Sequence, residues 1–157
     1  MKRKENGKKD FENFFFEFID NQKNKYHPLV FIRGNPKIGK NTFIGFFSEI
    51  WAKDSSITIG DNCDIASFVS INTADSHKKC IGIIKSIERK PIVIEDNVFI
   101  GSHCVIKGGA RIGHNSVVAA GTIVDGVKIP PYSLIFGNPM KVREGYYLKK
   151  LKDYGKK

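Results

Sequence analysis

The chain has 157 residues, of which 41% are hydrophobic and 27% charged, and its formal net charge is +10. This composition predicts one soluble, globular domain and excludes an intrinsically disordered chain. No apolar run approaches the about 20 residues that a transmembrane helix needs. The basic start, MKRKENGKKD, lacks the apolar stretch of a signal peptide, so we expect a cytoplasmic protein without membrane contacts.

The positive charge is concentrated at both ends of the chain, and the segment 141–157 alone contains seven Lys or Arg residues. Solubility explains such a distribution, as does attraction of a polyanionic ligand. No recognition helix, RNP-type aromatic pattern or zinc finger accompanies the charge, so we do not expect nucleic acid as a partner.

The three cysteines, Cys63, Cys80 and Cys104, share no CxxC spacing, which indicates free thiols instead of a disulfide or a zinc site.

Residues 1–28 form a basic N-terminus followed by a predicted amphipathic helix. Asp10 is a candidate N-cap, and apolar residues recur after it at helical spacing: Phe11, Phe14, Phe15, Phe18 and Ile19. We expect this helix to pack against the end of the following domain or against a neighbouring subunit. Four carboxylates between Asp10 and Asp20 argue against a helix that lies on an anionic membrane.

Residues 29–137 are dominated by an aliphatic residue that recurs every six positions. A six-residue period fits neither an α-helix nor ordinary hairpins, but it fits short strands joined by tight corners, three to a triangular coil. The second position of each hexad is often Gly or Ala, and the fifth is mostly small or β-branched, which would place Cys63 and Cys104 inside the prism. The thirteen positions in register are Ile32, Ile38, Ile44, Ile50, Ile59, Ile65, Ile71, Ile94, Ile100, Ile106, Ile112, Val118 and Val124.

The count stops at His77 and resumes after Pro91, so we expect residues 77–91 to leave the prism wall as a loop. His77 stands at the start of this loop. Histidine is suited to proton transfer because its ordinary pKa lies near neutrality. The residues alone leave open whether His77 is functional or structural. We expect the other three histidines, His27, His103 and His114, to be structural or solvated.

The C-terminal part begins with Pro130-Pro131, which we expect to end the coils, and with a turn at Gly137-Asn138-Pro139. Residues 138–157 form a basic segment that is partly helical in this interpretation.

The segments PIVIEDNVFIGSHCVIKGGARIGHNSVVAAGTIV and KIPPYSLIFGNPMKV resemble the hexapeptide-repeat acyltransferases, particularly galactoside, maltose and bacterial surface-sugar O-acetyltransferases. The resemblance covers about residues 29–143. It implies an all-β, left-handed parallel β-helix that forms a homotrimer, with acetyl-CoA in a groove between adjacent prisms and no metal ion.

The same resemblance implies roles for individual residues. His77 matches the catalytic histidine, which acts as general base during direct acetyl transfer. Ser102 and Ala120 match main-chain contacts to the pantetheine arm of acetyl-CoA, while Lys141 and Arg143 match basic positions near its phosphates.

The acceptor site departs from the family pattern. Phe46 and Phe47 stand where galactoside-type members carry an asparagine-containing sequence, which indicates a less polar pocket or a stacked ring. Asp54 matches an acid that contacts the acceptor, and Glu49 and Asp75 are candidates to line the site and to orient His77, although a backbone carbonyl would also serve. These differences argue against a galactoside or maltose as the acceptor and leave room for a deoxy-sugar or an amino-deoxy-sugar, including one carried on a nucleotide.

The predicted function is therefore acetyl transfer from acetyl-CoA to a hydroxyl or amine of a sugar-type acceptor. Two alternatives remain open: an acetyltransferase that inactivates an antibiotic, and a non-catalytic β-helix used as a scaffold. A γ-carbonic-anhydrase-like zinc prism would use His77, His103 and His114, but the ending IPPYSLIFGNPMKV favours the transferase.

Overall fold

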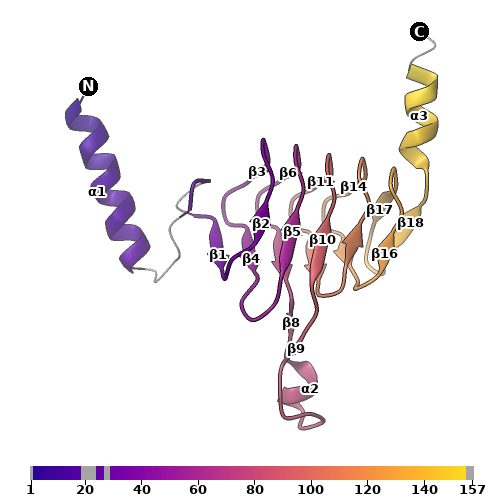
Figure 1. The fold of residues 1–157 in the computed structure, drawn as a ribbon, viewed down its shortest axis with the longest axis horizontal. Coiled ribbons are helices and arrows are strands. Elements are labelled where there is room, and N and C mark those ends of the chain that lie inside the picture. Colours follow the sequence, from indigo (N-terminus) through magenta and orange to yellow (C-terminus); the bar gives the residue numbers. More distant parts are fainter. Residues whose placement is uncertain (1, 19–23, 27–28, 155–157) are drawn as a thin grey trace.

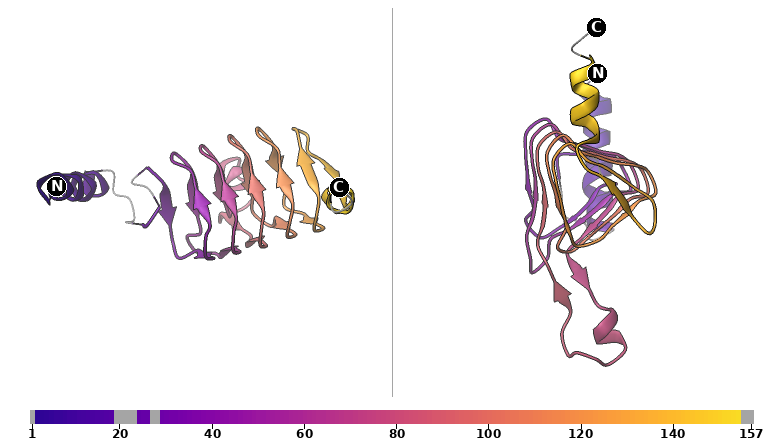
Figure 2. Two further views of the ribbon diagram at one scale, coloured as in Figure 1. Left: turned by 90° about the horizontal axis from the view of Figure 1, so that it is seen from above. Right: turned by 90° about the vertical axis from the view of Figure 1, so that its right-hand side faces the viewer.

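A computed structural model describes residues 2–18, 24–26 and 29–154 of the chain (Figure 1). The central part is a prism of stacked coils with a triangular outline when it is viewed end-on (Figure 2, right). Each side of the triangle is a sheet of short strands, and neighbouring strands in a sheet come from successive coils. The predicted parallel β-helix is confirmed.

Three sheets form the walls of the prism. Sheet A contains β1 (Phe31–Arg33), β4 (Glu49–Trp51), β7 (Ser70–Asn72), β12 (Val105–Lys107) and β15 (Ile123–Val124). Sheet B contains β2 (Lys37–Ile38), β5 (Ile57–Ile59), β10 (Ile92–Ile94), β13 (Arg111–Ile112) and β16 (Lys128–Ile129). Sheet C contains β3 (Phe43–Ile44), β6 (Asp64–Ile65), β11 (Phe99–Ile100), β14 (Val117–Val118), β17 (Leu134–Phe136) and the antiparallel β18 (Lys141–Arg143).

The hexad residues fill the prism. Of the thirteen aliphatic positions, twelve are buried and Ile38 packs against the core from its edge. Cys63 and Cys104 are 2% and 0% exposed, as expected for small residues at the fifth position. Burial of this continuous apolar column stabilises the fold, because each aliphatic side chain removed from water contributes about 1.5 to 3 kcal/mol.

The geometry of the corners explains why the second position of each hexad is often Gly or Ala. Coils stack so closely that a Cβ added to Gly60 would lie 2.7 Å from the Asp96 nitrogen and 2.8 Å from the Glu95 carbonyl carbon. At the corner between sheets B and C, one residue of each coil has a positive φ, a conformation that Asn tolerates better than most residues. These residues are Asn41, Asn62, Asn97, Asn115 and Tyr132.

The coils continue past Pro130-Pro131, so these prolines do not end them as expected, although the last parallel strand, β17, still lies within the range 29–137. Ile129 and Ile135 are buried at 2% and 0% exposure, and β16 and β17 add to sheets B and C. The two prolines form a corner after β16, which is the last strand of sheet B. A proline is tolerated there because no further strand needs its N–H.

Helix α1 (Lys2–Phe18) begins earlier than predicted, so Asp10 lies inside the helix and does not cap it. Phe11 and Phe14 are each 62% exposed and pair with Phe15 and Phe18 on the same helix, with ring centroids 6.0 Å apart. The aromatic face therefore does not pack against the prism of its own chain. Ile19 and His27 lie outside the described residues.

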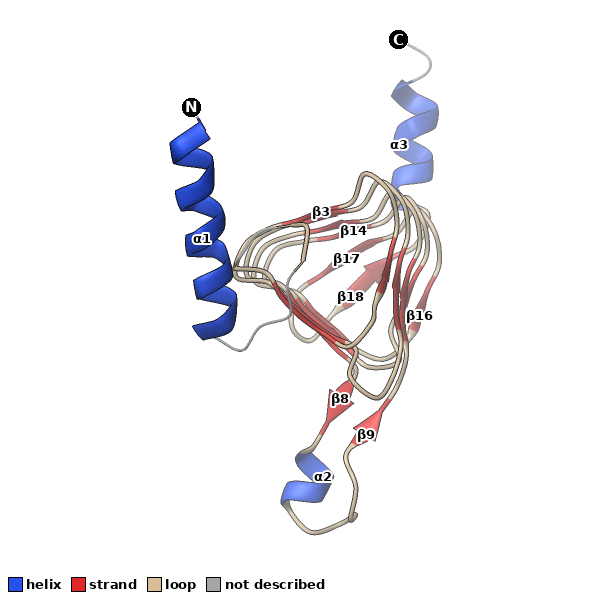
Figure 3. Ribbon diagram, turned by 60° about the vertical axis from the view of Figure 1, so that its left-hand side comes forward, coloured by secondary structure: helices blue, strands red, loops and turns tan. Residues whose placement is uncertain are grey.

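The prism carries two further additions. Helix α3 (Tyr146–Tyr154) follows β18 at the C-terminal end, in the segment expected to be partly helical. An arm formed by residues 74–89 projects from the corner between sheets A and B (Figure 3). Across the described ranges, none of the helices has both the length and the apolar character needed to cross a membrane.

Candidate active site

The arm holds His77 away from the prism wall. Its base is a short antiparallel ladder of β8 (Ala74–Asp75) and β9 (Glu88–Arg89), and α2 (His77–Cys80) follows β8 directly. The Lys78 Nζ lies 3.0 Å from the Glu88 Oε2, which ties α2 to the returning strand. The sequence leaves the prism here because the residues after Asp75 no longer supply an aliphatic side chain every six positions.

His77 and Asp75 form a close pair at the start of the arm. The His77 Nδ1 lies 2.5 Å from the Asp75 Oδ1, and the His77 backbone N–H donates to the same oxygen at 3.2 Å. The hydrogen bonds from the His77 side chain and then from its backbone lower the pKa of Asp75 below its ordinary value. An ionised carboxylate can only accept a hydrogen bond, so in the neutral form of the ring the proton is on Nδ1 and the lone pair on Nε2.

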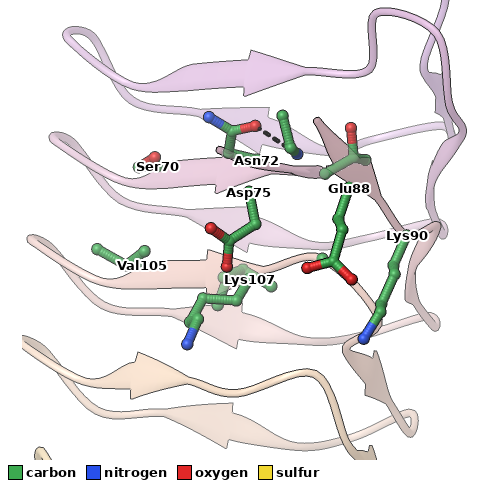
Figure 4. A pocket seen from close by; sticks show the side chains of 11 residues that line it. Ser70, Asn72, Asp75, Glu88, Lys90, Val105 and Lys107 are labelled. Carbon is green, nitrogen blue, oxygen red and sulfur yellow. Dashed lines mark hydrogen bonds between the residues drawn. The ribbon is translucent and has the colours of Figure 1, made fainter. Parts of the chain in front are cut away.

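A cavity of about 230 Å³ lies between the base of the arm and sheet A, and Asp75 is one of its walls (Figure 4). The other polar or charged side chains that line it are Ser70, Asn72, Thr73, Glu88, Lys90 and Lys107. The cavity is therefore polar, opens next to the histidine-bearing segment, and has room for part of a small polar molecule.

Two of the predicted acceptor residues lie close to this cavity. The Glu49 Oε1 accepts a hydrogen bond of 2.6 Å from the Ser70 hydroxyl, so its carboxylate lies beside a residue of the cavity wall and is bonded to that residue and not to His77. Asp54 lies in the corner before β5, where its Oδ2 is 3.6 Å from an Arg89 guanidinium nitrogen at the base of the arm.

Phe46 belongs to a different edge of the prism. It lies at the corner between sheets C and A, and its ring meets that of Phe47 edge-on at 5.5 Å. Phe47, Phe68 and His103 stack on one another along this corner, with successive centroids 5.1 and 5.0 Å apart. All three have φ near +60°, a conformation in which a bulky residue is uncommon. We call the three the aromatic column.

The predicted acetyl-CoA residues follow the same edge toward the C-terminus. The Gly121 N–H donates to the Ser102 carbonyl at 2.9 Å, which places the Ala120 corner directly beside Ser102. On the next coil, Phe136 pairs with Lys141 across β17 and β18. The Arg143 guanidinium lies 5.3 Å from the centroid of the Phe136 ring. Ser102, Ala120 and Lys141 therefore form a row along one edge that ends in exposed positive charge.

The predicted site residues thus fall into two groups within one chain. His77, Asp75 and Asp54 lie at the corner between sheets A and B, whereas Phe46, Ser102 and Ala120 lie at the corner between sheets C and A. The corners border opposite sides of sheet A. At about 3.3 Å per residue, a wall of one hexad separates them by about 15 to 20 Å.

The remaining described histidines lie apart from His77. The His114 ring meets the Tyr132 ring edge-on at 5.2 Å, and His103 belongs to the aromatic column. No group of three or more His, Cys, Asp or Glu side chains in the described ranges is arranged to hold a metal ion.

Comparison with known proteins assigns the family. The family described as "Hexapeptide repeat of succinyl-transferase" matches residues 37–72 and 91–126. The crystal structure of a hexapeptide-repeat-containing acetyltransferase from Vibrio cholerae, in complex with acetyl coenzyme A, superposes with a TM-score of 0.65 at 32% identity. The match covers 79% of this chain and 68% of that one. The chain belongs to the hexapeptide-repeat acetyltransferases.

Two sugar acetyltransferases are also similar to this hexapeptide-repeat protein. A galactoside O-acetyltransferase of Escherichia coli K12 is 41% identical over 118 residues, which are 73% of this chain and 57% of the relative. A maltose O-acetyltransferase from Clostridium difficile 630 shares 26% identity and a TM-score of 0.61, with coverage of 86% and 84%. The chain thus spans somewhat more than half the length of the galactoside enzyme.

Several cavity residues of this hexapeptide-repeat protein were not predicted from sequence, namely Ser70, Asn72, Glu88, Lys90 and Lys107. A signal existed for three of them, because Ser70 also adjoins the buried hexad residue Ile71 on its strand. Asn72 and Lys107 each follow a buried hexad isoleucine by one residue, so strand alternation turns their side chains outward. Glu88 and Lys90 lie at the end of the loop, where the hexad count gives no orientation.

Proposed function

We propose that this hexapeptide-repeat protein transfers an acetyl group from acetyl-CoA to a hydroxyl or amine of a sugar or amino sugar. The observation that carries the proposal is the His77–Asp75 pair beside the cavity under the arm. It presents an imidazole whose Nδ1 is bonded to Asp75 and whose Nε2 has no part in that bond, next to a polar space that opens to solvent. A group of this kind suits removal of a proton from an attacking hydroxyl or amine.

The proposed reaction is one direct transfer. As the acceptor oxygen or nitrogen bonds to the thioester carbonyl carbon, the His77 Nε2 takes the proton that the acceptor loses. Asp75 stabilises the imidazolium that results, because its carboxylate already accepts the Nδ1–H. The carbon–sulfur bond then breaks, and His77 returns the proton to the leaving thiolate. No covalent bond between the protein and the acetyl group is needed.

The edge that carries Ser102 and Ala120 suits acetyl-CoA. It combines backbone groups exposed at tight corners with the exposed cations Lys141 and Arg143 at its C-terminal end. In this proposal the corners contact the pantetheine arm and the cations attract the phosphates. The Vibrio cholerae relative, determined with acetyl coenzyme A bound, supports the choice of cofactor.

A homotrimer would complete the site. Within one chain His77 and the Ser102 edge lie on opposite sides of sheet A, so one protomer would supply the base and its neighbour the cofactor edge. Closed cyclic assemblies join different surfaces of neighbouring subunits in this manner. We place the protein in the cytoplasm, a proposal that the three free cysteines support.

A panel of acceptors tests the proposal. Free sugars, nucleotide-linked amino sugars and antibiotics are each mixed with acetyl-CoA and the protein, and release of CoA is measured. We expect release with at least one sugar-type acceptor. Turnover with antibiotics alone would favour the antibiotic-inactivating alternative. Flat results across the panel, without protection of the protein by CoA against heat, would support a scaffold.

A further inference from the structure

Two polar groups in the arm cavity, the Asn72 amide nitrogen and the Lys90 ammonium, have no hydrogen-bond or ion-pair partner among the described residues. The proposed proton transfer gives neither of them a role. The Asn72 Oδ1 accepts the Ala74 N–H at 2.8 Å, but the Asn72 amide nitrogen has no acceptor among the described residues. The Lys90 backbone N–H donates to the Thr73 carbonyl at 3.0 Å, while its ammonium group has no ion pair in the described part of the chain. Both side chains line the cavity (Figure 4).

The other charged side chains of the cavity are compensated. The Glu88 carboxylate pairs with Lys78 at 3.0 Å, and the Lys107 ammonium pairs with Asp125 at 3.0 Å. Asp75 accepts two hydrogen bonds from His77. Lys90 is therefore the one cation of the lining without a carboxylate partner in the described ranges.

A cation and an amide donor that both lack an acceptor are suited to an anion. A carboxylate or phosphate oxygen would take a charge-assisted hydrogen bond from Lys90. The Asn72 amide nitrogen points away from Lys90 (Figure 4), so it would donate to a different oxygen of the same molecule. A neutral sugar hydroxyl would satisfy the amide but would leave the ammonium uncompensated. Since the cavity borders Asp75, a molecule anchored there by its anionic group would lie close to His77.

We propose that the arm cavity binds an anionic group of the acceptor, so that the preferred substrate is an acidic or a phosphorylated sugar. The inference rests on the proposed acetyl transfer and deepens it by naming the acceptor class. A carboxylate of a uronic acid and a phosphate of a sugar phosphate share the chemistry that Lys90 recognises. The experiment therefore includes one of each.

Binding is measured by calorimetry on the full chain in the presence of CoA, with galactose, galacturonate and galactose 1-phosphate as ligands. We expect at least one of the two anionic ligands to bind about 10-fold more tightly than galactose, and the better one identifies the anion. Lys90→Gln should weaken that ligand about 10-fold and leave galactose unchanged. The matched control is Lys85→Gln, because Lys85 is also exposed in the arm but does not line the cavity.

Equal binding of the three sugars, no binding of any, or the same affinities in Lys90→Gln and Lys85→Gln would overturn the inference. Acetylation of the same sugars is measured in parallel. Acetylation without preference for an anion would leave the proposed function standing while the anion site fails. Lys90-dependent binding of an anion without acetyl transfer to any acceptor would contradict the proposed function instead.

Discussion

In the proposed reaction, Asp75 determines which nitrogen of His77 acts as the base. Its carboxylate holds the proton on Nδ1, and the free electron pair is therefore on Nε2. Without the carboxylate the imidazole could adopt either tautomer and could rotate, since its side chain is 60% exposed. Asp75 is thus a positioning residue for the proposed reaction.

Substitution Asp75→Asn should lower kcat by about 10-fold or more with little change in KM for acetyl-CoA, because the amide no longer stabilises the imidazolium. Steady-state rates with the best acceptor of the panel check this. A matched control is Asp153→Asn, which removes an exposed carboxylate on α3 that does not line the cavity. Equal rates for Asp75→Asn and the wild type would contradict the positioning role.

The pKa of Asp75 gives a second test at the same scale. The hydrogen bonds from His77 lower it, so His77→Ala should raise the pKa of Asp75 toward its ordinary value. A carboxyl whose pKa is depressed in the folded state stabilises that state above its unfolded pKa, and the contribution is lost as the pH falls through the folded pKa. Titration of the carboxyl carbon by NMR in both proteins measures the shift, and an unchanged value would show that the pair does not form in solution.

At the scale of elements, the hexad residues carry the stability of the prism. Ile59 is 2% exposed, whereas its neighbour Thr58 points outward on the same strand. Ile59→Ala should lower the free energy of unfolding by about 2 to 5 kcal/mol. Thr58→Ala should change it by no more than about 0.5 kcal/mol. Denaturant unfolding of both variants compares them, and similar losses would contradict the predicted register.

The hexad pattern made the prism predictable because every coil needs the same residue types at the same positions. Each needs an aliphatic residue inside and a small or turn-forming residue at the corner. The break at His77 located the arm for the same reason. The path of the arm could not be predicted, because residues 77–91 have no period and are positioned by local contacts such as the Lys78–Glu88 pair. Pro130-Pro131 misled the prediction because a proline pair ends most strands, whereas a corner after an edge strand tolerates it.

The site was predictable only in part. His77 could be singled out because it ends the count, and Asp75 because it lies two residues away. Glu49 accepts a hydrogen bond from Ser70 and is not bonded to His77. This follows from the register of β4 with β7, which places Glu49 and Ser70 side by side and could not be predicted from the sequence. The cavity depends on how the arm returns to the prism, and the hexad count does not specify that return.

At the scale of the whole molecule, the proposed function joins the two groups of site residues across two copies of the chain. His77→Ala removes the base, and Ala120→Trp should block the opposite edge, so each variant alone should be inactive. When the two are unfolded, mixed in equal amounts and refolded together, about one quarter of the sites would combine an intact base with an intact edge. Recovery of about that share of the wild-type rate supports a site between protomers, and no recovery argues for a site within one chain.

The rate of acetyl transfer by His77→Ala tests the central claim most directly. Turnover of the best acceptor in the panel is compared between wild type and variant, with light scattering to verify that both have the same assembly state. We predict a rate lower by about 10² to 10⁴-fold with the assembly intact, the usual consequence of losing a general base. A near-normal rate in His77→Ala would contradict the account.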